Sequence, residues 1–187
     1  MKKTRGAWPG NDPVYIDYHD QEWGYSVHDD QKLFEYLLLE TFQAGLSWIT
    51  ILKKRENFRL AFDNFNAKII AGYDEQKMDE LMLDAGIIRN RLKIKSATTN
   101  AQLFLKTQQE FGSFDNYIWQ FTAHKTIVNH WENIKQLPSC SSESDSMSKD
   151  LKKRGFKFVG STVCYAFMQA VGMIDDHTLD CFRKTSK

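Results

Sequence analysis

The chain of 187 residues is long enough to bury one hydrophobic core of ordinary size. Hydrophobic residues make up 42% and aromatic residues 13% of the sequence, a composition that excludes an intrinsically disordered chain. The formal net charge is +1, so any contact with nucleic acid must come from local basic patches rather than from a uniformly basic protein.

The N-terminal segment and the cysteines indicate a reducing, cytoplasmic setting. The segment MKKTRGAWPGNDP carries two lysines with no apolar run behind them, which is unlike a secretory signal. No window approaches the ~18 apolar residues of a membrane helix, so we expect no membrane partner. The three cysteines (Cys140, Cys164 and Cys181) include no CxxC pair and indicate no disulfide framework.

Few prolines and few alternating β-branched runs predict an all-α fold of short helices, arranged as an orthogonal bundle. Asp29 or Asp30 can cap a helix over 31–43, and Ser47 can cap the next helix over 48–62. Further helices are predicted over 67–71, 75–84, 91–108, 113–122, 145–154 and 161–171.

Four large aromatic residues crowd together near the N-terminus, within sixteen residues of chain: Trp8, Tyr15, Tyr18 and Trp23. Rings at this density can belong to the hydrophobic core. They can also form a stacking pocket for a planar heterocycle. The sequence leaves both interpretations open.

Glu40 lies at the edge of the apolar stripe of helix 31–43, seven residues after Leu33. An acid at the margin of such a stripe is commonly salt-bridged or extends toward solvent. The alternative is a carboxylate held in an apolar pocket, where it accepts hydrogen bonds from a ligand and favours a cationic one. Periodicity alone does not decide between these two roles.

The turn 44-AGLS-47 joins the first two predicted helices. Gly45 permits a positive φ and the close approach of another backbone. Leu46 should lie at the tip, where it can staple the two helices together or act as a wedge in a base stack; spacing alone favours the staple. Trp48 shares a helix face with Ile51, so core packing accounts for Trp48 as well.

A second glycine turn, 85-AGII-88, is followed by Arg89, Arg91 and Lys93. A glycine turn that opens a helix N-terminus presents free backbone N–H groups, which suit a phosphate. The alternative is an ordinary turn between two helices followed by a solvated basic segment. Gly86 and Arg89 are therefore candidate DNA contacts.

Three residues form a candidate metal set. His177 and Cys181, within 175-DDHTLDC-181, are one helical turn apart, a spacing that suits two ligands of one ion. His19, in 18-YHD-20, is a third candidate. Such a small set does not define a site by itself, and unrelated roles stay open.

Together these stretches resemble the DNA-3-methyladenine glycosylase I family of helix–hairpin–helix DNA repair enzymes. The resemblance runs from about Trp8 to Cys181, and it is carried by 12-DPVYIDYHDQEWG-24, 43-QAGLSWITILKKRENF-58, 84-DAGIIRNRLKI-94 and 151-LKKRGFKFVGSTVCYAFMQAVG-172. It implies a single glycosylase domain over residues 1–187 with the helix–hairpin–helix type of orthogonal bundle.

The resemblance also implies an activity. The enzyme would flip 3-methyladenine out of alkylated double-stranded DNA and hydrolyse its N-glycosidic bond, leaving an abasic site and free 3-methyladenine. No lysine is singled out as a Schiff-base nucleophile, so strand cleavage is not expected. The alternative is a non-catalytic helix–hairpin–helix DNA-binding protein, which would keep the glycine hairpin and the basic patches but would need no base pocket.

The resemblance assigns roles to the residues above. Glu40 would hydrogen-bond the flipped base and is the candidate catalytic residue, with recognition as its first role. Gly45 and Leu46 would meet the base stack, with Leu46 in the gap that the flipped base leaves. The hairpin at Gly86 would grip the DNA backbone through its amides. The base pocket would consist of Tyr15, Tyr18 and Trp48, with Trp8 nearby.

The family usually binds a structural zinc ion through an N-terminal Cys, a His after the second pocket Tyr, and a C-terminal His-x3-Cys. His19, His177 and Cys181 match three of these positions, whereas Gly6 stands where the first Cys is expected. Three protein ligands and a water would hold Zn²⁺ weakly for a structural role. The alternative is a vestigial site whose termini are tied by other contacts. No organic cofactor is expected, and a single-lesion substrate favours a monomer.

Overall fold

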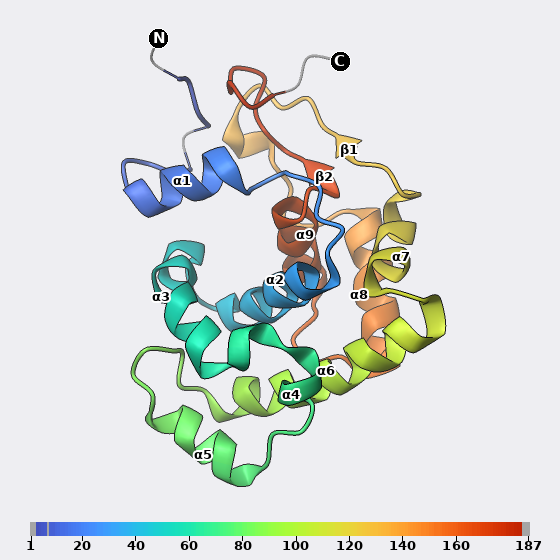
Figure 1. The fold of residues 1–187 in the computed structure, drawn as a ribbon. Helices are drawn as coiled ribbons and strands as arrows, with labels where there is room; N and C mark the ends of the chain where they lie inside the picture. The colour runs from blue at the N-terminus through green and yellow to red at the C-terminus, as the bar shows by residue number, and fades with distance from the viewer. Residues whose placement is uncertain (1–2, 7, 185–187) are drawn as a thin grey trace.

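The computed structural model describes residues 3–6 and 8–184, and these form a mostly helical protein (Figure 1). The α-helices of the described residues are α1 (Pro13–Gln21), α2 (Asp30–Gln43), α3 (Trp48–Ala61), α4 (Ala67–Ile70), α5 (Glu75–Leu83), α6 (Arg91–Phe111), α7 (Phe114–Trp119), α8 (Ser142–Arg154) and α9 (Ser161–Ala170). The shorter elements are the 3₁₀ helices η1 (Asp63–Phe65), η2 (Gln120–Thr122) and η3 (Ile134–Gln136), and the strands β1 (Ile127–Val128) and β2 (Ile174–Asp175).

Helix α2 forms the centre of the hydrophobic core and contacts α3, α6, α7 and α9 (Figure 1). Asp29 begins it, because the Asp29 carboxylate accepts a hydrogen bond from the Lys32 amide at 2.9 Å. Most of its residues are buried, so α2 offers an apolar surface on several sides rather than on one stripe. The carboxyl end of α2, where Glu40 lies, leads into the turn before α3.

The structure confirms every predicted helix and adds one that the sequence analysis missed. Helix α1 begins after Asp12, whose carboxylate accepts a hydrogen bond from the Val14 amide at 3.0 Å, with Pro13 at the first helical position. Helix α8 begins three residues earlier than predicted, because Ser141 and Ser144 form a capping box.

Two segments that are distant in the sequence pair as a short parallel sheet, which the sequence analysis also missed. Ile127 of β1 lies opposite Ile174 of β2, and Val128 lies opposite Asp175. Two-residue strands are too short to show a period-two pattern, so no sequence signal predicts them. The pairing places the segment that carries His177 directly after β2.

The N-terminal and C-terminal segments lie on the same side of the molecule as α1 (Figure 1). The Phe182 amide donates a hydrogen bond to the Thr4 carbonyl oxygen at 2.9 Å. This contact brings Gly6 close to the residues after β2. No helix formed by residues 3–6 and 8–184 combines the length and the apolar character that crossing a bilayer requires.

Candidate active site

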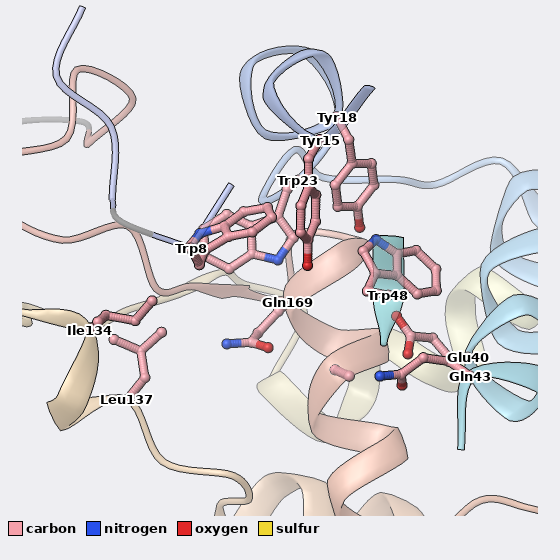
Figure 2. A pocket seen from close by; sticks show the side chains of 11 residues that line it. Trp8, Tyr15, Tyr18, Trp23, Glu40, Gln43, Trp48, Ile134, Leu137 and Gln169 are labelled. Carbon is pink, nitrogen blue, oxygen red and sulfur yellow. The ribbon is translucent and has the colours of Figure 1, made fainter. Parts of the chain in front are cut away.

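A cavity of about 240 Å³ opens beside the carboxyl end of α2 (Figure 2). This volume is below the roughly 300–1,000 Å³ of clefts that hold drug-sized ligands, so the cavity suits one small planar group. Its lining residues come from α1 and the segments on either side of it, from α2, α3 and α9, and from η3 and the residue after it: Trp8, Tyr15, Tyr18, Trp23, Glu40, Gln43, Trp48, Ile134, Leu137, Ala166 and Gln169.

Aromatic rings form one wall of the cavity, and both tyrosines point into it from α1 (Figure 2). The Trp8 ring lies 4.7 Å from the Tyr15 ring and 5.1 Å from the Trp23 ring, in edge-to-face arrangements. The rings of Tyr18 and Trp48 lie 5.6 Å apart. The N-terminal aromatic residues therefore belong to both the core and the cavity wall, the two interpretations that the sequence left open.

Glu40 lines the cavity next to Trp48 (Figure 2) and is only 3% exposed. Its Oε2 atom has no hydrogen-bond partner in the described chain, and no cation pairs with it. Burial raises the pKa of the Glu40 carboxyl to about 8. The structure therefore excludes the salt-bridged role and shows a carboxyl group in an apolar pocket.

Trp48 supplies a second buried polar atom without a partner. The Trp48 ring packs against the core, as its helical spacing predicts, but its Nε1–H donates no hydrogen bond within the described residues. Buried donors and acceptors that stay unpaired are rare and costly. Glu40 and Trp48 therefore leave one acceptor and one donor for a ligand that enters the cavity.

The Glu40 carboxyl group also affects the pKa of Tyr15. Burial raises the pKa of Tyr15, and the charge of Glu40 raises it further. The pKa of Tyr18 lies well above its usual range, chiefly because the phenol is buried. Both tyrosines are thus neutral around pH 7, and their rings keep their hydrogen-bonding hydroxyl groups.

The basic block Lys53-Lys54-Arg55 is engaged within the protein. Arg55 lies inward and donates to both carboxylate oxygens of Glu22, at 2.6 and 2.7 Å. Burial alone would raise the pKa of Glu22, but the hydrogen bonds from Arg55 and a tyrosine outweigh burial and lower it. Lys53 pairs with Asp12 at 2.6 Å, and Lys54 donates to a main-chain oxygen at 2.9 Å. None of these three cations pairs with Glu40.

The turn after α2 places an apolar side chain beside the cavity. Gly45 adopts φ +82°, a conformation that glycine accommodates without strain. The Gln43 side-chain amide donates to the Leu46 carbonyl oxygen at 3.1 Å and thereby fixes the tip. Leu46 is 40% exposed, which argues against the helix-stapling role that spacing favoured and leaves its side chain at the surface.

Lys93 forms hydrogen bonds to the main chain of this turn. The side chain is buried, and its Nζ donates to the carbonyl oxygens of Phe42 at 2.8 Å and Ala44 at 2.6 Å. These are carbonyl groups at the end of α2 that lack helical partners. Lys93 therefore connects the first turn of α6 to the tip that carries Leu46.

The turn between α5 and α6 differs in part from the prediction. The Gly86 amide is not free, because it donates to the Asp84 carboxylate at 2.7 Å. A Cβ at Gly86 would lie 2.9 Å from the same carboxylate and 3.0 Å from the Asn57 Cβ, so the glycine is required for close packing. Among the basic residues that follow, Lys93 is buried, whereas Arg89 is exposed.

Arg91 forms surface ion pairs within the protein. Its guanidinium pairs with Glu75 at 2.5 Å and with Asp79, and both acids belong to α5. Arg89 is thus the residue of this basic segment that the structure leaves at the surface without an ion pair among the described residues. The sequence pattern did not distinguish these three roles.

The three candidate metal ligands meet at one place. The ligand atoms of His19, His177 and Cys181 all lie within 4.8 Å of one another, and the three side chains are buried. Gly6 and these three residues border one small cavity. The spacing argument therefore identified residues that the fold does bring together.

Several cavity residues carried no sequence signal. Gln43, Ala166 and Gln169 look like ordinary helical residues, and Ile134 and Leu137 look like loop residues. Gln43 lies on α2 itself, and the fold brings the other four residues to the cavity from α9 and the η3 segment. Gln169 is held by a 2.7 Å hydrogen bond from its side-chain amide to Asp176.

A mostly helical protein with an aromatic cavity and one buried, unpaired carboxyl group falls in the class of proteins that bind a flat, electron-poor heterocycle. The sequence profile of the methyladenine glycosylase family matches residues 8–184. A DNA-3-methyladenine glycosylase of Haemophilus influenzae is 48% identical over 183 residues, which are 98% of this chain and 99% of the relative. The chain therefore belongs to the methyladenine glycosylase family.

Solved structures agree with this assignment. A crystal structure of 3-methyladenine DNA glycosylase I matches with a TM-score of 0.95 at 44% identity, covering 97% of this chain and 100% of the other. A variant of 3-methyladenine DNA glycosylase I in complex with 3-methyladenine matches with a TM-score of 0.94 at 36% identity, covering 97% and 98%. The mostly helical fold is thus shared along almost the whole chain.

Proposed function

We propose that this protein is a DNA repair glycosylase that flips 3-methyladenine out of alkylated duplex DNA and hydrolyses its N-glycosidic bond. The observation that carries the proposal is the unpaired Glu40 carboxyl group facing a wall of aromatic rings in a cavity of the size of one base. Relatives that cover almost the whole chain carry the name of this activity, and one of the matching structures holds 3-methyladenine.

The chemistry of the lesion fits the cavity. Alkylation at N3 places positive charge on adenine, which weakens the glycosidic bond and makes the base a good leaving group. The faces of Tyr15, Tyr18 and the tryptophans attract such a cation, and the Glu40 carboxylate neutralises part of its charge. An unmodified adenine lacks this charge, so the same groups favour the damaged base.

Glu40 acts first in recognition. Its pKa of about 8 means that the free enzyme holds a neutral carboxylic acid around pH 7. A bound cation favours ionisation of Glu40, because opposite charges at short range stabilise each other. Tight binding of the cationic ground state would by itself slow departure of the base, since only preferential stabilisation of the transition state accelerates the reaction.

The Trp48 N–H and the Glu40 Oε2 give the pocket its hydrogen-bonding pattern. They supply one donor and one acceptor that the protein itself leaves unpaired. A base that satisfies both is bound more tightly than one that leaves either group buried and unpaired. The pocket thereby selects by hydrogen bonding as well as by charge.

Leu46 and the α5–α6 turn supply the DNA contacts in this proposal. Exposed Leu46 lies in the turn between Gln43 and Trp48, which both line the cavity, and its side chain can fill the gap left by the flipped base. Exposed Arg89 can approach a phosphate at the start of α6. Two helices joined by this glycine turn support the helix–hairpin–helix subtype of orthogonal bundle.

In this proposal the whole chain forms one glycosylase domain, and the enzyme is a monomer. The Thr4–Phe182 hydrogen bond joins the two ends, which supports a single glycosylase domain over residues 1–187. A single base lesion as substrate favours a monomer that leaves an abasic site without cutting the strand. Water supplies the hydroxyl that replaces the base at the sugar, so no organic cofactor is required.

Base release from methylated duplex DNA tests the proposal. We expect the wild-type protein to release 3-methyladenine and Glu40→Gln to release it at least about tenfold more slowly, because the neutral amide cannot balance the cation. Glu80→Gln, at an exposed site on α5, is the matched control and should keep the wild-type rate.

The results of this experiment test the enzyme proposal and the role of Glu40 separately. If the wild-type protein binds DNA but releases no methylated base, it is a non-catalytic DNA-binding protein and the enzyme proposal is wrong. If Glu40→Gln matches the wild-type rate, the enzyme proposal stands and the role of Glu40 is wrong.

A further inference from the structure

Gln169 lines the base cavity from α9, and one hydrogen bond fixes which way its side-chain amide faces. Its Nε2 donates to Asp176 Oδ2 at 2.7 Å. A carboxylate offers only acceptors, so the amide nitrogen must face Asp176 and the amide oxygen must face away from it. In Figure 2 the nitrogen lies on the side of Ile134 and Leu137, and the oxygen lies on the side of Glu40. Gln169 therefore presents a hydrogen-bond acceptor to the cavity.

Asp176 is itself held in one orientation. It is 2% exposed, and three donors besides Gln169 surround its carboxylate. Trp131 Nε1 and Asn129 Nδ2 donate to Oδ1 at 2.7 and 2.8 Å, and the Tyr165 hydroxyl donates to Oδ2 at 2.6 Å. A carboxylate with two donors on each oxygen has no reason to rotate, so the Gln169 amide is fixed before any ligand binds.

The damaged base has one kind of group that such an acceptor can bind. In an adenine that is alkylated at N3 and joined to deoxyribose, the ring nitrogens N1 and N7 are acceptors, and only the exocyclic amino group carries N–H donors. This amino group has two N–H bonds, so it can serve both Glu40 and Gln169, which line the same cavity. A 6-oxo purine places an acceptor at the same edge, and two facing acceptors leave the buried groups unpaired.

We propose that Gln169, oriented by Asp176, is a specificity-determining residue that accepts a hydrogen bond from the exocyclic amino group of the flipped base. The inference rests on the proposed function and adds a second selection to it. Glu40 and the aromatic rings favour positive charge, whereas Gln169 favours a 6-amino over a 6-oxo purine. Asp176 is a positioning residue, because it acts through Gln169.

The affinities for two free bases test the inference. Calorimetry compares 3-methyladenine with 3-methylhypoxanthine, which carries an oxygen in place of the amino group. We expect the wild-type protein to bind 3-methyladenine at least about tenfold more tightly, and Gln169→Met to lower this ratio at least about fivefold, because methionine offers no comparable acceptor. Gln108→Met is the matched control, since Gln108 also donates to an aspartate, Asp30, at 2.6 Å but does not line the cavity. It should keep the wild-type ratio.

Asp176→Asn tests the positioning role. Trp131 Nε1 is a donor only, so the oxygen of the new amide must stay on the side of Trp131, and its nitrogen turns toward Gln169. The Gln169 amide then reverses to accept from this nitrogen, and its own nitrogen faces the cavity. We expect the ratio to fall below that of Gln169→Met, in favour of 3-methylhypoxanthine. A general loosening of the fold would weaken the binding of both bases equally and leave the ratio unchanged.

Three results would overturn the inference. The first is a wild-type protein that binds the two bases equally. The second is a Gln169→Met variant with the wild-type ratio. The third is a folded Asp176→Asn variant with the wild-type ratio, which would make Asp176 a purely structural residue. If Asp176→Asn does not fold, the comparison of Gln169→Met with Gln108→Met decides alone.

Base release from methylated duplex DNA by the same preparations separates this inference from the proposed function. A wild-type protein that releases 3-methyladenine, together with an unchanged ratio in Gln169→Met, would show that only the role of Gln169 is wrong. A wild-type protein that releases no methylated base would show that the proposed function is wrong, whatever the ratio of the affinities.

Discussion

Glu40 is the residue at which the structure departs most clearly from ordinary protein chemistry. Its carboxyl group is buried beside rings, without a cation or a hydrogen bond on Oε2. A folded protein usually avoids this arrangement, because the ionised form is strongly destabilised there. The raised pKa keeps the Glu40 carboxyl group protonated at neutral pH, and in the proposed function the cationic base would supply the missing partner.

This protonation predicts how stability depends on pH. Burial raises the pKa of Glu40 from 4.5 in the unfolded chain to about 8 in the folded one. The folded state then binds the extra proton, so the free energy of unfolding decreases as pH rises from about 4.5 to about 8, by on the order of a few kcal/mol from this group. Glu40→Gln removes this contribution, and the variant should be the more stable protein at about pH 9.

Urea unfolding of both proteins between about pH 5 and pH 9 measures the effect. The difference between variant and wild type isolates Glu40 from the other titrating groups, among them His19, whose pKa burial lowers. A difference that stays constant across this range would contradict a protonated Glu40 in the free protein.

At the scale of elements, the prediction of helices succeeded where apolar residues recur with helical spacing. Helix α1 was missed because it has no apolar stripe with helical spacing. Its buried residues are Tyr18, which lines the cavity, and His19, which belongs to the candidate metal site. The Asp12-Pro13 pair was the available signal, since it forms the N-cap and first position of that helix.

Lys93 connects α6 to the end of α2, and its replacement tests whether this connection supports DNA binding. Lys93→Met removes the two hydrogen bonds to the end of α2 and should lower the free energy of unfolding by ~1–3 kcal/mol. The larger functional effect should fall on the turn that carries Leu46. We expect weaker binding of abasic or lesion DNA and slower base release, with unchanged affinity for free 3-methyladenine, because the pocket itself stays intact.

Filter binding with DNA and calorimetry with the free base make the comparison. Lys95→Met, an exposed position on the same helix, is the control for loss of positive charge. Equal losses of DNA affinity in Lys93→Met and Lys95→Met would show that charge, and not the position of the turn, is responsible.

At the scale of the whole molecule, the cavity depends on contacts that the sequence does not display. Its lining combines residue 8 with residue 169, and the pairing of β1 with β2 precedes the segment that carries His177. Composition and periodicity describe neighbours along the chain, so they identified Glu40 and the tyrosines only as candidates. The resemblance to a family joined those candidates into one site, but it gave no account of Lys93.

The N-terminal segment that carries Trp8 shows how the whole chain supports the pocket. Arg5 donates to both carboxylate oxygens of Asp20, at 2.7 and 2.5 Å, and so ties this segment to α1. The hydrogen bond from Arg5 is the main reason that the pKa of Asp20 falls to about 2. Because this pKa is depressed, the contribution of Asp20 to stability is present above about pH 4 and is lost only as pH falls through about 2.

Arg5→Met should therefore loosen the aromatic wall at any pH between about 5 and 9. We expect weaker binding of free 3-methyladenine, a higher KM for base release and a modest decrease in thermal stability. Arg59→Met is the matched control, because Arg59 pairs with Glu35 through two nitrogens at comparable exposure and neither residue lines the cavity. It should lower stability without changing the affinity for the base. If both variants bind 3-methyladenine as wild type does, the Arg5–Asp20 pair serves stability alone and Trp8 is positioned by its ring contacts.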